Sequence, residues 1–311
     1  MSAWTTADIP DQTGKLVVIT GATGGLGYET ALALAGKGAE VMLTGRSNAK
    51  GLDALTRIRA IHPEARIDFE LLDLSRLASV REFADRFAKT HDRIDILVNN
   101  AGVMALPKRQ VTADGFEMQF ETNYLGHFAL TALLLPHLLA APAPRTVQLS
   151  STAAQMGKLH FDDLQFAQRY SPFLCYAQSK LAMLMFALEL QRRADRNGWH
   201  LLSTAAHPGY ARTDLIPNGM GGGLASTMAT LFGRVMSQSP AQGALPQLYA
   251  ATSPEAKPGG YYGPDGLFEM TGMPKNAGIP HRAVDEAAAA RLWSMSEEMA
   301  GIRFPQAARA A

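Results

Sequence analysis

The chain has 311 residues, of which 47% are apolar and 18% are charged, and its formal net charge is +1. This composition excludes a disordered chain, a coiled coil and a collagen-like repeat, and the balanced charge argues against a nucleic-acid or anionic-membrane partner. The single cysteine, Cys175, excludes an intrachain disulfide and a cysteine-rich zinc site. We therefore expect a soluble globular protein without a metal site.

Short apolar runs alternate with helical patterns from residue 15 onward. The predicted strands are 15–20, 40–44, 66–74, 94–100, 145–151, 200–208 and a weak strand near 261–262. The predicted helices are 29–36, 49–60, 79–90, 112–139 and about 176–194. Continuous apolar strands between helices are typical of a parallel sheet that is covered on both faces. The sequence therefore predicts one α/β domain over residues 1–311, a Rossmann-type doubly wound parallel sheet of about seven strands.

A glycine-rich stretch lies in the segment 212–240, with glycines at 219 and 221–223. Such a stretch is compatible with a flexible linker, but it follows the sixth strand and precedes further helix. Because long loops in compact domains are usually functional, we interpret this segment as a mobile cover over a substrate pocket.

The first strand is followed by the turn TGATGGLG, which contains Gly21, Gly25 and Gly27. Glycines allow the backbone to approach a pyrophosphate, whose charge is stabilised at the N-terminus of the next helix. Thr23 and Leu26 lie in the same turn. The position of the turn between strand and helix predicts a dinucleotide-phosphate site.

The end of the second strand discriminates between NAD and NADP. An NAD site normally places an acidic residue there to hold the ribose hydroxyls, whereas this chain reads Thr-Gly-Arg-Ser-Asn at 44–48. The guanidinium of Arg46 can bind a 2′-phosphate that an acid would repel. We therefore predict NADP(H) as the cofactor.

Tyr176 and Lys180 occur in the sequence YAQSK, and a helix brings residues at this spacing onto one face. An ammonium beside a phenol favours the phenolate, so we expect Lys180 to lower the pKa of Tyr176. Tyr176 is then a candidate general acid and base.

The glycine turn, the NNAG segment at 99–102 and YAQSK together resemble the short-chain dehydrogenase/reductase family. The resemblance implies a catalytic group of four residues: Asn123, Ser151, Tyr176 and Lys180. In it Ser151 hydrogen-bonds the substrate oxygen, Tyr176 transfers the proton, Lys180 also binds the nicotinamide ribose, and Asn123 holds a water. Ser150 is adjacent to Ser151, but strand alternation points its side chain to the other face.

The resemblance also implies further cofactor contacts after the strands. These are Asp73 and Leu74 at the adenine, Asn100, Ala101 and Gly102 at the adenosine ribose, Pro208 and Gly209 in a turn, and Thr213 at the carboxamide.

The long insert between Ser151 and Tyr176 and the sequence DGFEMQFETNYLGHF resemble the retinol-dehydrogenase-like subgroup. That subgroup has an N-terminal membrane anchor, but the first fifteen residues here contain no apolar run. We therefore expect a cytoplasmic protein that does not bind a membrane, without carrying over retinoid specificity. By resemblance we expect a homodimer or homotetramer.

These observations predict an NADP-dependent oxidoreductase that interconverts a ketone or aldehyde and its alcohol. The candidate pocket residues are apolar and favour a bulky hydrophobic substrate; they are Phe173, Leu215, Ile216, Met220, Leu224 and Met228. One alternative is a catalytically silent NADP-binding regulator, in which we would expect Ser151, Tyr176 or Lys180 to be lost. Another is a sugar-nucleotide epimerase or dehydratase, whose turn usually reads TGxxGxxG.

Overall fold

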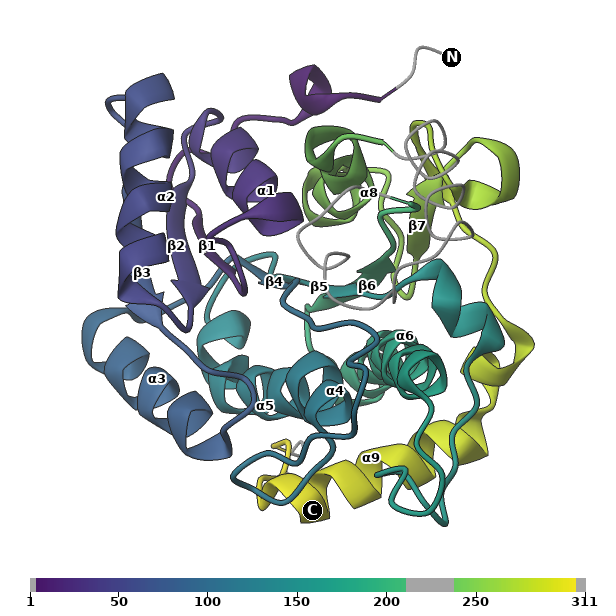
Figure 1. Ribbon diagram of the computed structural model, residues 1–311. Coiled ribbons are helices and arrows are strands. Elements are labelled where there is room, and N and C mark those ends of the chain that lie inside the picture. Colours follow the sequence, from purple (N-terminus) through teal and green to yellow (C-terminus); the bar gives the residue numbers. More distant parts are fainter. Residues whose placement is uncertain (1–3, 211–237, 306–311) are drawn as a thin grey trace.

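An eight-stranded sheet crosses the molecule in the computed structural model, which describes residues 4–210 and 238–305 (Figure 1). The strands are β1 (Leu16–Ile19), β2 (Glu40–Gly45), β3 (Ile67–Leu71), β4 (Ile96–Asn99), β5 (Arg145–Leu149), β6 (Leu202–Ala206), β7 (Tyr261–Pro264) and β8 (Pro274–Asn276). Their order is β3-β2-β1-β4-β5-β6-β7-β8, and every neighbouring pair is parallel except β7 and β8. This is the order of a doubly wound Rossmann-type sheet, so the predicted fold class is confirmed.

The central strands are buried because both faces of the sheet are covered. All four residues of β1 and all four of β4 are buried, as expected for parallel strands between helical layers. β8 was not predicted from the sequence, and it pairs antiparallel with β7 at the edge of the sheet. Its sequence, Pro-Lys-Asn, has no apolar pattern, and proline is tolerated at such an edge.

Helices cover the two faces of the sheet in separate layers (Figure 1). One layer contains α1 (Gly25–Ala35), α2 (Asn48–Ile61) and α8 (Pro240–Thr252). The other contains α3 (Leu77–Thr90), α4 (Met118–Phe120), α5 (Gly126–Leu139) and α6 (Pro172–Asn197), with α9 (Glu286–Ala300) packed outside α5 and α6. Short 3₁₀ helices are η1 (Thr6–Asp8), η3 (Thr152–Met156), η4 (Leu267–Glu269) and η5 (His281–Val284).

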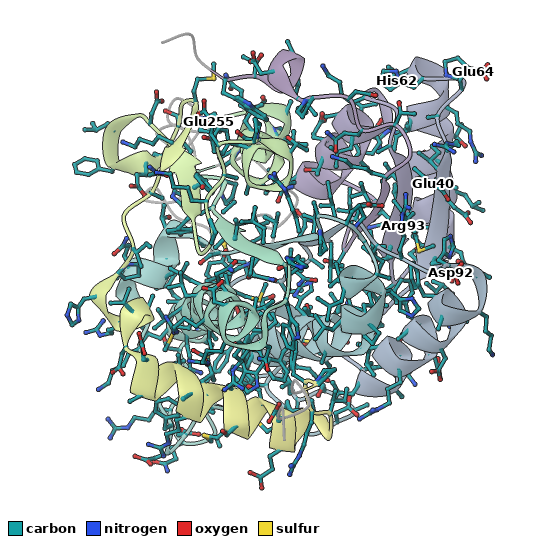
Figure 2. The ribbon with its side chains drawn as sticks, turned by 180° about the vertical axis from the view of Figure 1, so that it is seen from behind. Glu40, His62, Glu64, Asp92, Arg93 and Glu255 are labelled. Carbon is teal, nitrogen blue, oxygen red and sulfur yellow. The ribbon has the colours of Figure 1, made fainter. Side chains whose placement is uncertain are left out.

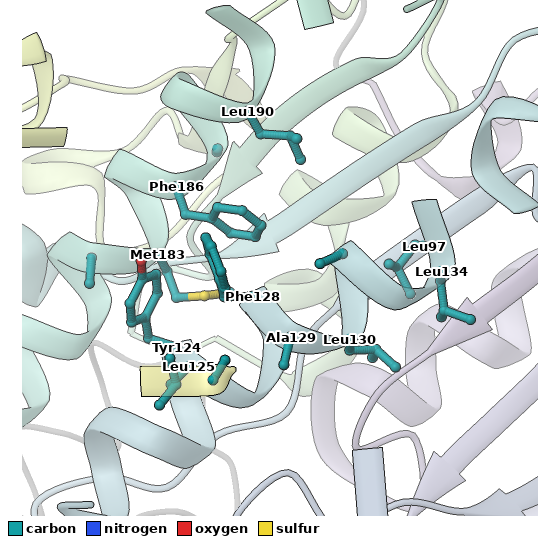
Figure 3. Close-up of a cluster of buried hydrophobic side chains, with 14 of the residues drawn as sticks. Leu97, Tyr124, Leu125, Phe128, Ala129, Leu130, Leu134, Met183, Phe186 and Leu190 are labelled. Atoms are coloured by element: carbon teal, nitrogen blue, oxygen red, sulfur yellow. The ribbon is translucent and has the colours of Figure 1, made fainter. Parts of the chain in front are cut away.

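Each face of the sheet has its own hydrophobic core. The larger core joins α3, α5, α6 and α9, and its centre is shown in Figure 3. Aromatic rings interlock there: Phe128 of α5 lies 5.3 Å from Phe186 of α6 and 5.0 Å from Trp293 of α9, between ring centroids. The C-terminal helix therefore belongs to the same core as the central helices.

α6 is long and apolar enough, by length and composition alone, to cross a membrane. Almost all of its most apolar stretch is buried inside the protein. Its place between the sheet and α9 identifies it as a core helix.

The predicted helix 112–139 begins later than the sequence pattern indicated. Thr112 and Phe116 instead close a turn, in which the Thr112 N–H donates to the Phe116 carbonyl at 2.9 Å and Gly115 has a φ of 88°. The helix starts at α4 and continues through a π-helical turn, η2 (Glu121–Leu125), into α5. Such π-turns are rare and are frequent at functional sites, and this one contains Asn123.

The amino ends and the carboxyl ends of the strands carry different kinds of residue. At the amino ends of the strands, Glu40 begins β2, and Arg93 and Glu255 lie in the loops before β4 and β7 (Figure 2). There Asp95 accepts the Leu16 N–H at 2.9 Å and pairs with Arg93 at 3.3 Å. At the opposite edge, where the parallel strands end, the sequence-predicted site residues come together.

Candidate active site

The turn after β1 is packed so closely that only glycine fits at two of its positions. A Cβ on Gly27 would lie 2.5 Å from the Gly21 carbonyl oxygen and 2.9 Å from the Ala22 Cα. A Cβ on Gly21, whose φ is +63°, would lie 2.9 Å from the Ala101 Cα. α1 begins at Gly25, four residues earlier than predicted, and its N-cap is Gly24, which has no side chain. Its first backbone N–H groups are therefore open to an anion.

Arg46 lies where β2 ends and is exposed. Its guanidinium has no hydrogen bond or ion pair with any residue in 4–210 or 238–305. Thr23 from the glycine turn packs over Gly45, where a Cβ would approach the Thr23 methyl to 3.0 Å. Arg46 thus follows Gly45 beside the turn as a cation without a partner among the described residues.

Asp73 and Leu74 follow β3 at the same edge. One oxygen of Asp73 accepts the Ser75 N–H at 3.0 Å and the Ser75 hydroxyl at 2.7 Å, which fixes the carboxylate. Leu74 is buried, and its carbonyl oxygen lies against Gly126, where a Cβ would approach it to 2.4 Å. The loop after β3 is thereby held against the start of α5.

The segment after β4 holds the glycine turn in place. The Asn100 side chain donates to the Thr20 carbonyl at 2.8 Å and to the Gly21 carbonyl at 3.3 Å. The backbone N–H groups of Asn100 and Ala101 both donate to the Thr20 hydroxyl at 2.9 Å. Thr20 opens the TGATGGLG turn, but the contacts of its hydroxyl join residues far apart in the sequence and were not predicted.

Three of the four predicted catalytic residues meet at α6. Tyr176 and Lys180 lie one turn apart on this helix and are 9% and 4% exposed. The Lys180 Nζ donates to the Leu149 carbonyl at 2.9 Å and lies 5.8 Å from the centre of the Tyr176 ring. Ser151 follows β5, and its hydroxyl lies close enough to Tyr176 to act on the pKa of the phenol.

The two neighbouring serines point in different directions. Ser150 donates its hydroxyl to the Lys180 carbonyl at 2.8 Å and is buried behind the helix. Ser151 caps η3, where its oxygen accepts the Ala153 N–H at 3.2 Å. Ser151 is therefore the serine that lies beside Tyr176.

Burial dominates the electrostatics of Tyr176 and Lys180. It raises the pKa of Tyr176, and the hydrogen bond from Ser151 acts in the opposite direction. Burial lowers the pKa of Lys180 to about 8. The pKa of Tyr176 is therefore raised and not lowered as predicted, because burial disfavours the phenolate more than Ser151 offsets.

The side chain of Asn123 is hydrogen-bonded to the backbone of Val103 in both directions. Its amide oxygen accepts the Val103 N–H at 2.7 Å, and its amide nitrogen donates to the Val103 carbonyl and to the Ser179 hydroxyl, both at 2.9 Å. Gly102 lies between it and Lys180, since a Cβ there would be 3.1 Å from the Asn123 oxygen and 3.4 Å from the Lys180 Nζ. Both donor hydrogens of the Asn123 amide are thus used within the protein.

The turn after β6 contains Pro208 and Gly209. Gly209 has a φ of +61°, and a Cβ there would lie 2.3 Å from the Met270 carbonyl oxygen. Its N–H donates to His207 Nδ1 at 3.2 Å, and His207 Nε2 contacts Glu269 at 3.0 Å. Glu269 and Met270 are distant from this turn in the sequence and have no local signal, so their contacts were not predicted.

The remaining predicted positions are not all described. Thr213, Leu215, Ile216, Met220, Leu224 and Met228 lie outside the described residues, as does most of the predicted cover at 212–240. Phe173 stands at the N-terminus of α6 and is 43% exposed. Tyr261 of β7, which was predicted only as a strand residue, donates its hydroxyl to the Ser151 carbonyl at 3.4 Å.

Comparison with known proteins matches residues 15–219 to a family described as short chain dehydrogenase. Retinol dehydrogenase 13 of Homo sapiens is 41% identical over 298 residues, which are 94% of this chain and 86% of that protein. Polyprenol dehydrogenase of Homo sapiens is 35% identical over 299 residues, covering 94% of this chain and 87% of that protein.

Solved structures show the same fold. An uncharacterized protein from Mycobacterium paratuberculosis has a TM-score of 0.81 and 40% identity, over 98% of this chain and 100% of the other. The NADP active-site complex of Pseudomonas aeruginosa RhlG has a TM-score of 0.65 and 25% identity, over 83% of this chain and 97% of the other.

Proposed function

Because the chain belongs to the short-chain dehydrogenase family, we propose that it uses NADP(H) to interconvert a ketone or aldehyde and the corresponding alcohol. One observation carries the proposal: Ser151, Tyr176 and Lys180 lie together at the edge of the sheet where the glycine turn and Arg46 also lie. All three side chains are in place, so no observation favours a catalytically silent regulator. The turn TGATGGLG fits TGxxGxxG as well as TGxxxGxG and so does not discriminate against the epimerase alternative. Similarity to alcohol dehydrogenases over 94% of the chain favours the dehydrogenase instead.

The residues present fit a dinucleotide phosphate. Cβ atoms at Gly21 and Gly27 would collide with the backbone, and the N-cap Gly24 leaves the start of α1 uncovered. A pyrophosphate placed there would accept backbone N–H bonds from a helix N-terminus. Arg46 favours NADP over NAD, because its exposed guanidinium can pair with a 2′-phosphate, and the NADP complex of a structural neighbour supports this choice.

The bound cofactor supplies or accepts the hydride, and the side chains handle the oxygen and the proton. The raised pKa keeps Tyr176 protonated at neutral pH, so its hydroxyl donates a proton to the carbonyl oxygen during reduction. Ser151 donates a hydrogen bond to the same oxygen and stabilises the charge that develops there. We therefore expect reduction to be the favoured direction near neutral pH, with oxidation requiring a higher pH.

Lys180 lies beside the proton donor Tyr176 and is placed to bind the ribose of the proposed cofactor. An ammonium has three N–H donors, and one of them is directed to the Leu149 carbonyl. The other two are available to a ribose hydroxyl and to a water near Asn123. Asn123 orients the Val103 backbone and Ser179 beside this group.

The substrate we propose is a bulky hydrophobic alcohol or carbonyl compound. The relatives include a retinol dehydrogenase and a polyprenol dehydrogenase, and both named alcohols have long apolar chains. The expected cytoplasmic location, the single NADP-binding domain and the homodimer or homotetramer remain predictions.

A panel of carbonyl compounds tests the proposed function. The full chain is incubated with NADPH and with retinal, long-chain aldehydes, short polar aldehydes or a sugar nucleotide, and cofactor oxidation is followed by absorbance. We expect turnover with kcat/KM rising with the apolar length of the aldehyde. Absence of NADPH oxidation with every carbonyl compound would reject the proposal.

A further inference from the structure

His127 is a completely buried residue of α5 whose two ring nitrogens are both bonded. Nδ1 lies 2.9 Å from the Asn123 carbonyl oxygen, and Nε2 lies 2.8 Å from the Thr20 hydroxyl. Asn123 belongs to the π-turn η2, and Thr20 is the residue between β1 and the glycine turn. The ring thus joins two parts of the candidate site that lie far apart in the sequence.

The hydrogen-bond partners determine which nitrogen carries the proton. A hydroxyl oxygen can accept two hydrogen bonds, and the Thr20 oxygen already accepts the N–H groups of Asn100 and Ala101. Its own hydrogen is therefore donated, and His127 Nε2 at 2.8 Å is a closer acceptor than the Val98 carbonyl at 3.4 Å. At the other end, the Asn123 carbonyl can only accept, so Nδ1 must donate. Both ends require the same neutral ring with its hydrogen on Nδ1.

The surroundings keep this ring neutral. Burial lowers the pKa of His127 to about 3, the hydrogen bond to Asn123 opposes the shift, and the positive charge of Lys180 lowers the pKa further. A second proton would sit on Nε2, where the Thr20 hydroxyl needs an acceptor. The ring therefore keeps one hydrogen-bonding pattern across the physiological pH range.

We propose that His127 is a positioning residue, which ties the Asn123 carbonyl in the π-turn to Thr20 and through it to the Asn100–Ala101 backbone. This role deepens the proposed function and rests on it. His127 does not reach the reacting atoms; it acts through Asn123, whose side chain orients Val103 and Ser179 next to Lys180. The His127 ring thereby fixes the position of the glycine turn relative to the proton-transfer residues.

Nitrogen NMR of selectively labelled histidine tests the geometry without any turnover. The signal of His127 is assigned from its loss in His127→Asn, and the wild-type spectrum is followed from pH 5 to pH 9. We expect a neutral ring with the hydrogen on Nδ1 and no titration in this range. A hydrogen on Nε2, or a midpoint near the ordinary histidine value of about 6.5, would overturn the proposal.

A matched pair of variants tests the positioning role. His127→Asn keeps a donor near the Nδ1 position, whereas His127→Gln places its amide near the Nε2 position and gives up the donor to Asn123. Since small displacements of reacting groups can cost about 100-fold in rate, we expect kcat to fall by about 10- to 100-fold in His127→Gln and much less in His127→Asn. We also expect the pH midpoint of kcat to move in His127→Gln, because the surroundings of Lys180 change.

Thr131→Val is the structural control. Thr131 lies one turn further along α5, is equally buried, donates to the His127 carbonyl at 2.8 Å and accepts from Asn99 at 2.9 Å. We expect this variant to lose stability while its kcat and pH midpoint stay at wild-type values. Equal kcat and pH midpoints in His127→Gln, His127→Asn and Thr131→Val would overturn the positioning role alone. A wild type without turnover would overturn the proposed function, and the role with it, whatever the NMR shows.

Discussion

The glycine turn after β1 and the start of α6 both lie at the carboxyl ends of the strands. The turn presents backbone groups, whereas α6 presents side chains. The turn is made of backbone: Gly21 and Gly27 leave no room for a Cβ, and α1 starts with open N–H groups. The α6 side is made of buried side chains, with Lys180 and Ser179 hydrogen-bonded and Tyr176 beside Ser151. The proposed phosphate site thus rests on close backbone packing, whereas the proposed proton-transfer site uses titratable groups whose pKa values are shifted by burial.

Removing the Lys180 charge is expected to have a large effect on both turnover and NADPH binding. In Lys180→Met the ammonium is lost while a chain of similar length fills its place. Because general acid–base catalysis contributes about 10²- to 10⁴-fold, we expect kcat to fall within that range and NADPH to bind more weakly. Burial disfavours the Lys180 charge, so the unfolding free energy in urea should equal or exceed that of the wild type. A large loss of stability together with unchanged kcat would contradict the account.

Gly27→Ala is expected to disturb the backbone of the glycine turn. Its Cβ would lie 2.5 Å from the Gly21 oxygen and 2.6 Å from the Asn100 side chain, and overpacking of this kind costs about 1–3 kcal/mol. We expect lower stability and loss of NADPH binding, measured by urea unfolding and by fluorescence titration.

Gly14→Ala is the control for a loss of stability that does not come from a collision in the glycine turn. Gly14 has a φ of +79° and open space around its Cβ position, and a left-handed alanine costs about 1–2 kcal/mol. This control should lose stability and bind NADPH normally. Similar loss of NADPH binding in both variants would mean that the turn is not the phosphate site.

The glycine turn could be predicted from the sequence, because the turn and the strand ends are local features. The side chains around α6 could be predicted only in part. Tyr176 and Lys180 have helical spacing, but Thr20, His127 and Tyr261 reach the site through contacts over long sequence separations. The start of α4 was misplaced because the turn at 112–117 depends on Thr112 and Gly115 rather than on apolar spacing. The sign of the Tyr176 pKa shift depended on burial, which a sequence does not show.

Arg46→Asp should alter cofactor choice without affecting the chemical step. Loss of a charge-assisted contact costs about 1.5–3 kcal/mol, or roughly 10- to 150-fold in affinity. We expect the ratio of kcat/KM for NADPH over NADH to fall by that factor or to invert. Arg303→Asp makes the same charge change at an exposed position after α9 and should leave the ratio unchanged. Equal use of NADH and NADPH by the wild type would remove the basis of the NADP assignment.

Glu121→Gln is expected to leave turnover at pH 7 unchanged and to alter only the pH dependence of stability. Burial raises the pKa of Glu121 from 4.5 to about 8, and the nearby Asp114 and Asp73 add to the shift. A carboxyl whose pKa is raised on folding stabilises the native state below its unfolded pKa and loses that contribution as pH rises through the folded pKa. The wild type should therefore lose stability, on the order of a few kcal/mol, between pH 4.5 and 8.

The difference between the two proteins isolates Glu121, because other groups such as Glu117 titrate in both. Urea unfolding at several pH values should give a flatter profile for Glu121→Gln than for the wild type. Parallel profiles would show that Glu121 does not hold its proton in the folded state.

The central claim is that Tyr176 donates the proton while the glycine turn and Lys180 hold the cofactor, and Tyr176→Phe tests it most directly. The substitution removes the hydroxyl and keeps the ring, so packing in α6 and NADPH binding should survive. With an aldehyde that the wild type reduces, we expect kcat to fall by at least about 10²-fold while the NADPH dissociation constant stays at the wild-type value. A Tyr176→Phe protein that binds NADPH normally and still reduces the aldehyde at the wild-type rate would contradict the account.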